Sequence, residues 1–320
     1  MSELRHDITT GDWVIISPVR LKRPNGSETT RRAALPEHDP GCPFCAGNES
    51  KTPPEIMAYR ESGAPCSKEW KIRVFPNAFP AIEAGHEVIV ESRNHSVPFF
   101  LQGRAETEIV VRAYIERYSA LAKDPRNKTI CIFRNHGKNA GASIAHPHSQ
   151  IIAAPVESPE ILKRKRACAE SLKKKGECVY CAIARGAKSS GLGVCENRDF
   201  IAFCPAAPKF PYEVWIAPKA HQSSLSEISR ETEALFAEIL RSALSKIYIA
   251  LANPDFNIVI HSIPEKGERD FHWFAQIAPR ISTIAGFEIG TGIYINPVPP
   301  EEAAEMLRNQ MPVQKSGSFR

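Results

Sequence analysis

The chain has 320 residues, and 41 Lys and Arg against 36 Asp and Glu give it a formal net charge of +5. Hydrophobic residues make up 42% and charged residues 24%, a balance that excludes collagen, a coiled coil and wholesale disorder. This length can bury one large core or two cores of about 150 residues each. No apolar run approaches the roughly 18 residues of a membrane span, and the N-terminal segment lacks the apolar core of a secretory signal. We therefore expect a cytoplasmic protein with no membrane-spanning segment.

The first informative element is a Cys-x-x-Cys pair formed by Cys42 and Cys45. Proline-rich and turn-rich segments flank it, whereas a redox dithiol usually follows a strand of a thioredoxin-like βαβ unit and opens a helix. The odd count of nine cysteines and the lack of a secretion signal argue against a disulfide framework. The pair is therefore interpreted as half of a zinc site, which needs two further thiolate or imidazole ligands. The five cysteines outside Cys-x-x-Cys pairs are interpreted as small apolar residues.

The elements that follow supply histidines. Apolar runs and helical spacing predict, in chain order, a strand at 88–90, a helix over 110–121, a strand at 129–134 and a strand at 146–155. His95 lies in the turn after the first of these strands, and His146 opens the last one. These two histidines are the further ligands that the first zinc site needs.

The same order of elements returns after a charged helix predicted within 157–176. The second copy has a Cys-x-x-Cys pair, a strand at 214–216, a helix over 235–247 and strands at 256–261 and 272–279. Fifty-one positions separate His95 from His146, and fifty-one also separate His221 from His272. The repeat predicts two zinc sites, made of Cys42, Cys45, His95, His146 and of Cys178, Cys181, His221, His272. Closed sites with four protein ligands are structural rather than catalytic.

The repeat predicts an α/β (α+β) fold of two tandem histidine-triad-like units, with mainly antiparallel sheets and packed helices. We place the units at 1–156 and 177–320, with the linker helix at 157–176 between them. The basic runs at 163–166 and 173–175 of this helix are interpreted as a solvated face.

The two copies differ where chemistry is expected. Gln150 has a counterpart in Gln276, but His148 has its counterpart in Phe274. Alternate residues of a strand share a face, so His148 is expected beside the zinc ligand His146 but free of the metal. A neutral imidazole is an available nucleophile at neutral pH. The first unit is therefore predicted to be active and the second to be a scaffold.

Segments near His148 in this prediction suit an anion. The loop 135–143 is small, polar and glycine-containing, so its backbone N–H groups and the Ser143 hydroxyl can cradle a phosphate. Arg20 and Arg23 offer further positive charge. An imidazole beside such a cradle can attack phosphorus and form a phosphoramidate, which an incoming phosphate then cleaves.

The motif His146-Pro147-His148-Ser149-Gln150, preceded by Asn135-x-Gly137 and Gly141-Ala142-Ser143, resembles the galactose-1-phosphate uridylyltransferases of the histidine-triad superfamily. The resemblance extends through 12–24, 42–45, 74–80 and 286–288, and so covers nearly the whole chain. It implies a ping-pong reaction in which UDP-glucose gives UMP to His148, and a hexose 1-phosphate such as galactose 1-phosphate then takes it.

The resemblance also implies roles for other residues. Gln150 would steady the nucleotidyl intermediate, with Ser143 as a further catalytic residue, and the family forms homodimers. The substrates would be held by Arg20, Arg23, Phe75, Asn77, Asn135, Gly141, Ala142, Ser143, Gln150, Gly286, Phe287 and Glu288.

Two departures leave the nucleotide open. Well-known members have Gly where this chain has Ser149, and they build their second metal site from a Glu and several His. The second Cys-Cys-His-His set and the ending at 286–297 look more like the ADP-glucose phosphorylase relatives, which use the same histidine with AMP and accept inorganic phosphate. We expect UMP as the transferred group, with an ADP-glucose phosphorylase or adenylyltransferase that transfers AMP as the alternative.

A zinc-knuckle nucleic-acid-binding protein is a remote alternative, motivated by the two Cys-x-x-Cys pairs and the positive charge. However, Cys45 and His95 are much farther apart than the roughly twelve residues of a C₂H₂ finger. We therefore expect nucleotide-sugar and hexose 1-phosphate substrates and no nucleic-acid partner.

Overall fold

A computed structural model of the chain describes residues 2–22, 35–60, 69–83 and 85–311, so Arg23 lies outside the described residues. Its main feature is a ten-stranded sheet in which all neighbouring strands are antiparallel. Across the sheet, the strands are β3 (Met57–Arg60), β4 (Trp70–Pro76), β5 (His86–Val90), β7 (His148–Ala154), β6 (Thr129–His136), β11 (Phe256–His261), β12 (Phe274–Pro279), β10 (Val214–Pro218), β9 (Phe200–Phe203) and β8 (Gly193–Glu196).

The sheet is built from two five-stranded halves in matching order, joined where β6 pairs with β11. Phe133 lies opposite Val259 at this junction. Helix α3 (Pro159–Lys175) connects the halves along the chain. The predicted α/β fold with mainly antiparallel strands and packed helices is confirmed, whereas the division into units at 1–156 and 177–320 stays a prediction.

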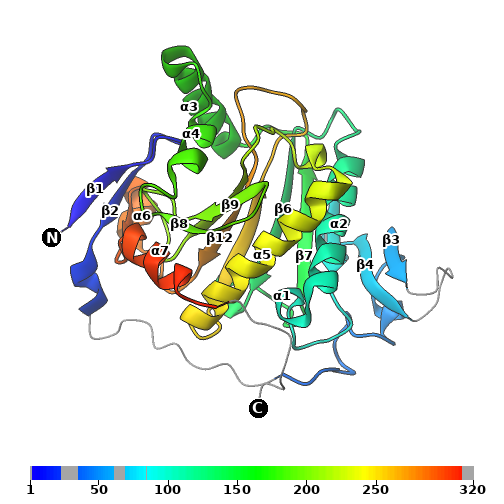
Figure 1. Ribbon diagram of the computed structural model, residues 1–320. Coiled ribbons are helices and arrows are strands. Elements are labelled where there is room, and N and C mark those ends of the chain that lie inside the picture. Colours follow the sequence, from blue (N-terminus) through cyan, green and yellow to red (C-terminus); the bar gives the residue numbers. More distant parts are fainter. Residues whose placement is uncertain (1, 23–34, 61–68, 84, 312–320) are drawn as a thin grey trace.

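One face of the sheet is covered by helices α1 (Phe99–Gln102), α2 (Arg104–Leu121) and α5 (Arg230–Ala250), which lie in front of the strands in Figure 1. The side chain of Ser229 caps the N-terminus of α5 by accepting a hydrogen bond from the Thr232 backbone N–H. Apolar residues at helical spacing, among them Phe236 and Leu240, are fully buried against the strands. Each such side chain stabilises the fold by about 2 kcal/mol.

The opposite face of the sheet holds the two Cys-x-x-Cys segments. The first packs on side chains of β4 and β5, and the second begins α4 (Val179–Gly186), which packs on β9, β10 and β12. Alternation along the strands therefore sends one set of side chains into the helix-covered core and the other set toward the Cys-x-x-Cys segments.

A second, three-stranded sheet brings the two ends of the described chain together. It contains β1 (Glu3–His6), β2 (Trp13–Ile16) and β13 (Tyr294–Asn296), with β2 in the middle. The adjoining elements are the 3-10 helix Pro18–Lys22, α6 (Gly286–Thr291) and α7 (Pro300–Arg308). The N-terminal segment thus packs with the C-terminal half of the chain rather than beside β7.

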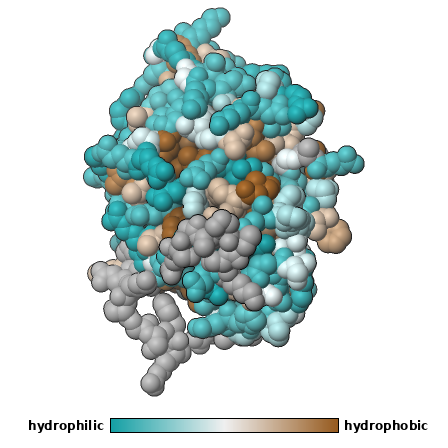
Figure 2. Space-filling view, turned by 90° about the vertical axis from the view of Figure 1, so that its right-hand side faces the viewer, coloured by the Kyte–Doolittle hydropathy of each residue, from teal (hydrophilic) through white to brown (hydrophobic). Residues whose placement is uncertain are grey.

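The surface at the β3–β4 edge shows small apolar groups surrounded by hydrophilic residues (Figure 2). Among the described residues, no helix combines the length and the apolar character needed to cross a membrane.

Candidate functional site

The first predicted ligand set comes together on the face of the sheet opposite helices α1, α2 and α5. We call this face the open face. Cys42, Cys45, His95 and His146 are all buried, and their ligand atoms lie within 4.8 Å of one another. The Cys45 Sγ atom lies 3.4 Å from His95 Nδ1 and 3.5 Å from His146 Nδ1. A tetrahedral zinc ion with ordinary bond lengths holds sulfur and nitrogen ligands about 3.6 Å apart. The spacing and the soft thiolate and imidazole donors therefore fit zinc.

The second predicted set, Cys178, Cys181, His221 and His272, forms a matching group. Cys181 Sγ lies 3.4 Å from the Nδ1 atoms of both His221 and His272. This group is less shielded than the first, because His221 is exposed and Cys181 is half-buried.

A backbone carbonyl group orients one histidine of each cluster, His146 in the first and His272 in the second. His146 Nε2 donates to the Ser92 carbonyl oxygen at 2.7 Å, and His272 Nε2 donates to the Pro218 carbonyl oxygen at 3.0 Å. The hydrogen is therefore on Nε2, and Nδ1 keeps its lone pair for a metal. Burial lowers the pKa of His146 to about 4, which favours the neutral ligating form.

His148, the predicted nucleophile, begins β7 and is buried beside the first cluster. Its Nδ1 lies 2.8 Å from the His146 carbonyl oxygen. A carbonyl can only accept, so Nδ1 carries the hydrogen and Nε2 presents a lone pair. Burial also lowers the pKa of His148, which keeps the imidazole neutral. His146 precedes β7 instead of lying within the strand as predicted. Its side chain belongs to the ligand set, and its backbone carbonyl oxygen orients the His148 ring.

Gln150 and Asn77 lie together on the same open face. Asn77 Nδ2 donates to Gln150 Oε1 at 3.2 Å, and His86 Nε2 lies 2.8 Å from the same oxygen. Phe75 contacts Phe44, with ring centroids 5.7 Å apart. Phe44 in turn lies edge-on to the His148 ring, with centroids 5.2 Å apart. Four predicted site residues, His148, Gln150, Asn77 and Phe75, therefore belong to one cluster.

The predicted phosphate loop is held by the second half of the chain. Asn257 on β11 donates from Nδ2 to Asn135 Oδ1 at 2.9 Å and to the Ala140 carbonyl oxygen at 2.8 Å. Phe133 on β6 pairs with Gln150 on β7. Asn135 lies two residues after Phe133, so it shares one face of the sheet with Gln150. Its Nδ2 lies 3.4 Å from the Gly141 carbonyl oxygen.

Three consecutive residues, Gly141, Ala142 and Ser143, complete the loop. Gly141 has a φ of +88°, a left-handed conformation that a side chain would strain. Ala142 donates its backbone N–H to the Gly137 carbonyl oxygen, and Ser143 is exposed.

A buried ion pair supports β7 from the core side. Arg134 Nε donates to the two Glu91 carboxylate oxygens at 3.1 and 2.9 Å, and both side chains are almost completely buried. The hydroxyl groups of Tyr114 and Ser149 also donate to Glu91. Ser149, one of the departures from the well-known relatives, thereby ties the residue after the nucleophile to this pair.

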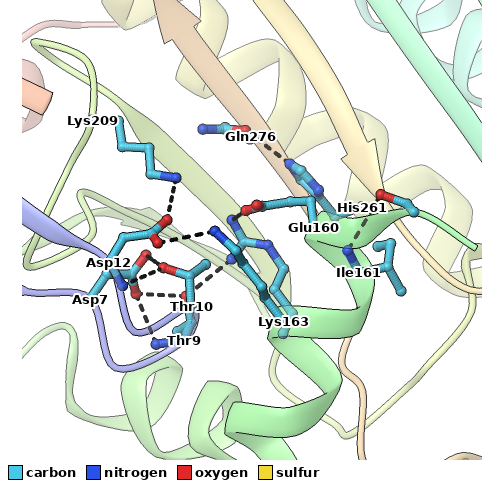
Figure 3. Close-up of polar contacts among 12 residues, drawn as sticks. Asp7, Thr9, Thr10, Asp12, Glu160, Ile161, Lys163, Lys209, His261 and Gln276 are labelled. Carbon is cyan, nitrogen blue, oxygen red and sulfur yellow. Dashed lines mark hydrogen bonds and ion pairs between the residues drawn. The ribbon is translucent and has the colours of Figure 1, made fainter. Parts of the chain in front are cut away.

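The corresponding position of the second half is filled by the chain itself. Phe274, which replaces the nucleophile, stacks on His261 with ring centroids 4.6 Å apart. Gln276 accepts a hydrogen bond from His261 at 2.9 Å (Figure 3) and donates from Nε2 to Glu213 at 2.7 Å. Both polar ends of Gln276 are therefore used internally.

The interpretation of 163–166 as a solvated face was wrong for Arg164. Its guanidinium lies over the ring of Phe274 at 5.1 Å and donates to Tyr180 and Glu160. Its neighbour Lys163 is 49% exposed and pairs with Asp12 (Figure 3). Arg164 is buried because α3 aims it into the aromatic cluster, where cation–π contacts and hydrogen bonds replace water.

Other predicted substrate residues lie elsewhere within the chain. Arg20 is in the 3-10 helix after β2, and Gly286, Phe287 and Glu288 begin α6. In Figure 1, β2 and α6 lie at the opposite side of the molecule from β3 and β4, with β7 beyond α5. Glu288 accepts a hydrogen bond from the Ala285 N–H, which caps its own helix.

Sequence reasoning missed four residues around this cluster, His86, Asn257, Glu91 and Arg134. The alternation in β5 contained a signal for His86, because His86, Val88 and Val90 share one face of the strand. Val88 pairs with Gln150, so this face of β5 lies at the site. Asn257 had no such signal, since its partners lie in the other half of the chain.

The sequence matches two family profiles. The family described as "Domain of unknown function (DUF4921)" matches residues 104–318, and "Domain of unknown function (DUF4931) N-terminal domain" matches residues 29–155. The chain is 33% identical over 331 residues to an ADP-glucose phosphorylase of Arabidopsis thaliana, covering 96% of this chain and 92% of the relative. It is 30% identical over 339 residues to a galactose-1-phosphate uridylyltransferase of Thermotoga maritima, covering 96% and 98%.

Solved structures agree with these matches. A crystal structure of an ADP-glucose phosphorylase from Arabidopsis thaliana with bound ADP-glucose has a TM-score of 0.85 at 33% identity, covering 97% of this chain and all of that one. A uridylyltransferase structure has a TM-score of 0.72 at 28% identity, covering 96% and 98%. Fold and matches together define an enzyme of the nucleotidyltransferase class. More particularly, the chain belongs to the histidine-triad-like family of the galactose-1-phosphate uridylyltransferases and ADP-glucose phosphorylases.

Proposed function

We propose that this enzyme transfers a nucleoside monophosphate from a nucleoside-diphosphate sugar to a phosphate-bearing acceptor through a covalent intermediate on His148. The observation that carries the proposal is the position of the hydrogen on the His148 ring. Its Nδ1–H is engaged by the His146 carbonyl, so the neutral ring keeps its lone pair on Nε2, and His148 shares one face of β7 with Gln150.

The reaction then has two displacements. In the first, His148 Nε2 attacks the α-phosphorus, the P–N bond forms, and the bond from that phosphorus to the bridging oxygen breaks, so that the sugar 1-phosphate leaves with the electron pair. In the second, an oxygen of the acceptor phosphate attacks the same phosphorus, the P–N bond breaks, and neutral His148 is restored. The Gln150 amide stabilises the charge on the phosphoryl oxygens in both steps.

We propose AMP as the transferred group and ADP-glucose with inorganic phosphate as the substrates. This reverses the order of preference that the sequence motif gave, where UMP, UDP-glucose and galactose 1-phosphate came first. The 33% identity to an ADP-glucose phosphorylase over 96% of the chain supports AMP. The second cluster consists of two cysteines and two histidines, unlike the second metal site of the well-known uridylyltransferases, and this also supports AMP. UMP transfer from UDP-glucose is the second candidate, supported by the Thermotoga maritima relative.

The experiment is to incubate the purified enzyme with ADP-glucose or UDP-glucose alone and to weigh the intact protein. We expect one added AMP per chain with ADP-glucose and little addition with UDP-glucose. The reverse preference would replace AMP by UMP, and no addition with either donor would remove the covalent mechanism for these substrates.

We propose that zinc fills both Cys/His clusters in a structural role. Each cluster offers four protein ligands, which leaves no position for a reacting water. Zinc would tie the first Cys-x-x-Cys segment to the residues that carry His148. The proposed chemistry therefore requires no step at the metal.

We also propose a homodimer in which a second copy supplies the missing sugar contacts. Arg20 and Glu288 carry this part of the proposal, because they belong to the three-stranded sheet region, away from β7 within one chain. That region exposes apolar side chains, including Ile289 at 77% and Val19 at 65%, as an interface does before it is covered. The cytoplasmic location and the lack of a nucleic-acid partner stay predictions.

Mixed dimers test this arrangement. A dimer of one His148→Asn chain and one Glu288→Ala chain, purified with two different tags, retains one intact site and should recover activity that both parent homodimers lack. An inactive mixed dimer, or a monomer in light scattering at assay concentration, would contradict a shared site.

A further inference from the structure

His86 lies at the start of β5 on the open face of the sheet and is 7% exposed. The Ala81 backbone N–H donates to His86 Nδ1 at 3.0 Å. A backbone amide only donates, so Nδ1 must carry a lone pair, and the hydrogen of the neutral ring is on Nε2. The fold thus selects one tautomer of His86.

That hydrogen determines the orientation of the Gln150 amide. His86 Nε2 lies 2.8 Å from the Gln150 side-chain atom assigned as Oε1, which must be an oxygen because Nε2 donates to it. Asn77 supplies a second donor: its Oδ1 accepts from the Phe79 N–H at 2.9 Å, so its Nδ2 faces Gln150 Oε1 at 3.2 Å. Asn77 Nδ2 and His86 Nε2 lie 3.1 Å apart because both donate to this one oxygen.

Two donors satisfy the two lone pairs of that oxygen. The amide therefore turns its Nε2 amino group away from His86, and the described residues offer that amino group no acceptor. In the second half, by contrast, the Gln276 amino group is engaged by Glu213. Of these two equivalent glutamines, only Gln150 keeps an amino group available to a phosphoryl oxygen among the residues that the structure describes.

We propose that His86 is a positioning residue that fixes the Gln150 amide with its N–H groups toward the transferred phosphoryl group. The role rests on the proposed nucleotidyl transfer and adds to it the orientation of Gln150. Without the His86 donor, the amide can rotate by half a turn and present its oxygen to the anionic phosphoryl group, which repels it.

Two substitutions separate the two nitrogens of His86. His86→Gln places an amide N–H at the position of Nε2 and keeps the donor to Gln150, whereas His86→Asn places its amide near Nδ1 and loses that donor. The measurement is the single-turnover rate of nucleotide attachment to the intact protein with ADP-glucose and with UDP-glucose. Zinc content and the thermal midpoint are recorded for both variants.

Attachment of the nucleotide to the wild-type enzyme is the control for the proposed function. If the wild-type enzyme attaches no nucleotide, the proposed function fails, and not only the role of His86. We expect His86→Asn to slow attachment at saturating nucleotide sugar by about tenfold or more, with an unchanged half-saturating concentration of that sugar, because one hydrogen-bond donor to the phosphoryl group is misdirected. His86→Gln should stay within about threefold of wild type. In a Gln150→Ala background, His86→Asn should have no further effect. Equal rates for wild type and His86→Asn, or an additive effect in the double variant, would overturn the role.

A measurement on the unaltered enzyme covers the case in which His86→Asn does not fold. The long-range ¹H–¹⁵N NMR spectrum of the histidine rings should show His86 with its hydrogen on Nε2 at neutral pH. A hydrogen on Nδ1 would overturn the proposal without any variant.

Discussion

Replacing Glu91 with Gln tests the buried support beneath the nucleophile strand. Glu91 and Arg134 have side chains that are 0% and 2% exposed, and their closest charged atoms are 2.9 Å apart. At that distance, their attraction is about 6 kcal/mol if the effective dielectric constant is about 20. The Gln variant keeps an acceptor for the Ser149 and Tyr114 hydroxyls but leaves the guanidinium of Arg134 without a counter-charge. Removing one partner of a buried pair costs about 3–5 kcal/mol, and we expect the lower end of that range.

The assay is urea denaturation of the metal-loaded protein, followed by tryptophan fluorescence. The matched control is Glu196→Gln, which removes a surface carboxylate paired with Lys188 and Lys219 and should leave the free energy of unfolding near the wild-type value. The Glu91 variant should also attach nucleotide more slowly, because Ser149 ties the residue next to His148 to this pair. If the free energy of unfolding of Glu91→Gln lay within about 1 kcal/mol of the wild-type value, the ion pair would not support this strand.

Three further predictions concern the site. His148→Asn should abolish both half-reactions and leave the metal content unchanged, whereas His146→Ala should lower the metal content and the thermal midpoint; equal metal loss in both variants would contradict their separate roles. Metal analysis should find two zinc ions per chain, and a strong chelator should lower the thermal midpoint until zinc is restored; a midpoint that does not respond would argue against structural metal. Asn257→Leu should lower kcat/KM for the nucleotide sugar by about tenfold with normal metal content, because Asn135 and the loop at Ala140 lose a shared donor; unchanged kinetics would remove that role.

The repeated spacing in the sequence predicted much of the site. Both Cys/His sets come together as predicted, since each ligand occupies the same place in a repeated unit. The helices and strands expected from apolar periodicity are present, and the helix expected within 157–176 is α3. His148 lies beside the first cluster as the motif indicated. Each of these features depends on residues within one half of the chain.

Features that join the halves could not be predicted in this way. The pairing of Phe133 with Val259 depends on two ordinary apolar residues with no motif around them. Arg164 reads as one more residue of a basic run, and only the direction of α3 buries it in the aromatic cluster. The state of His86 depends on one backbone N–H, at Ala81, whose direction no pattern of residue types records.

Locating the attached nucleotide within the chain shows whether His148 carries it. The enzyme is incubated with ADP-glucose, and in parallel with UDP-glucose, without an acceptor, then cleaved with a protease and sequenced by tandem mass spectrometry. We expect a nucleoside monophosphate on the peptide that contains His148, and its loss from that peptide when inorganic phosphate or a hexose 1-phosphate is added. A nucleotide found on another residue, or turnover of the sugar with His148 unmodified throughout, would contradict this role of His148.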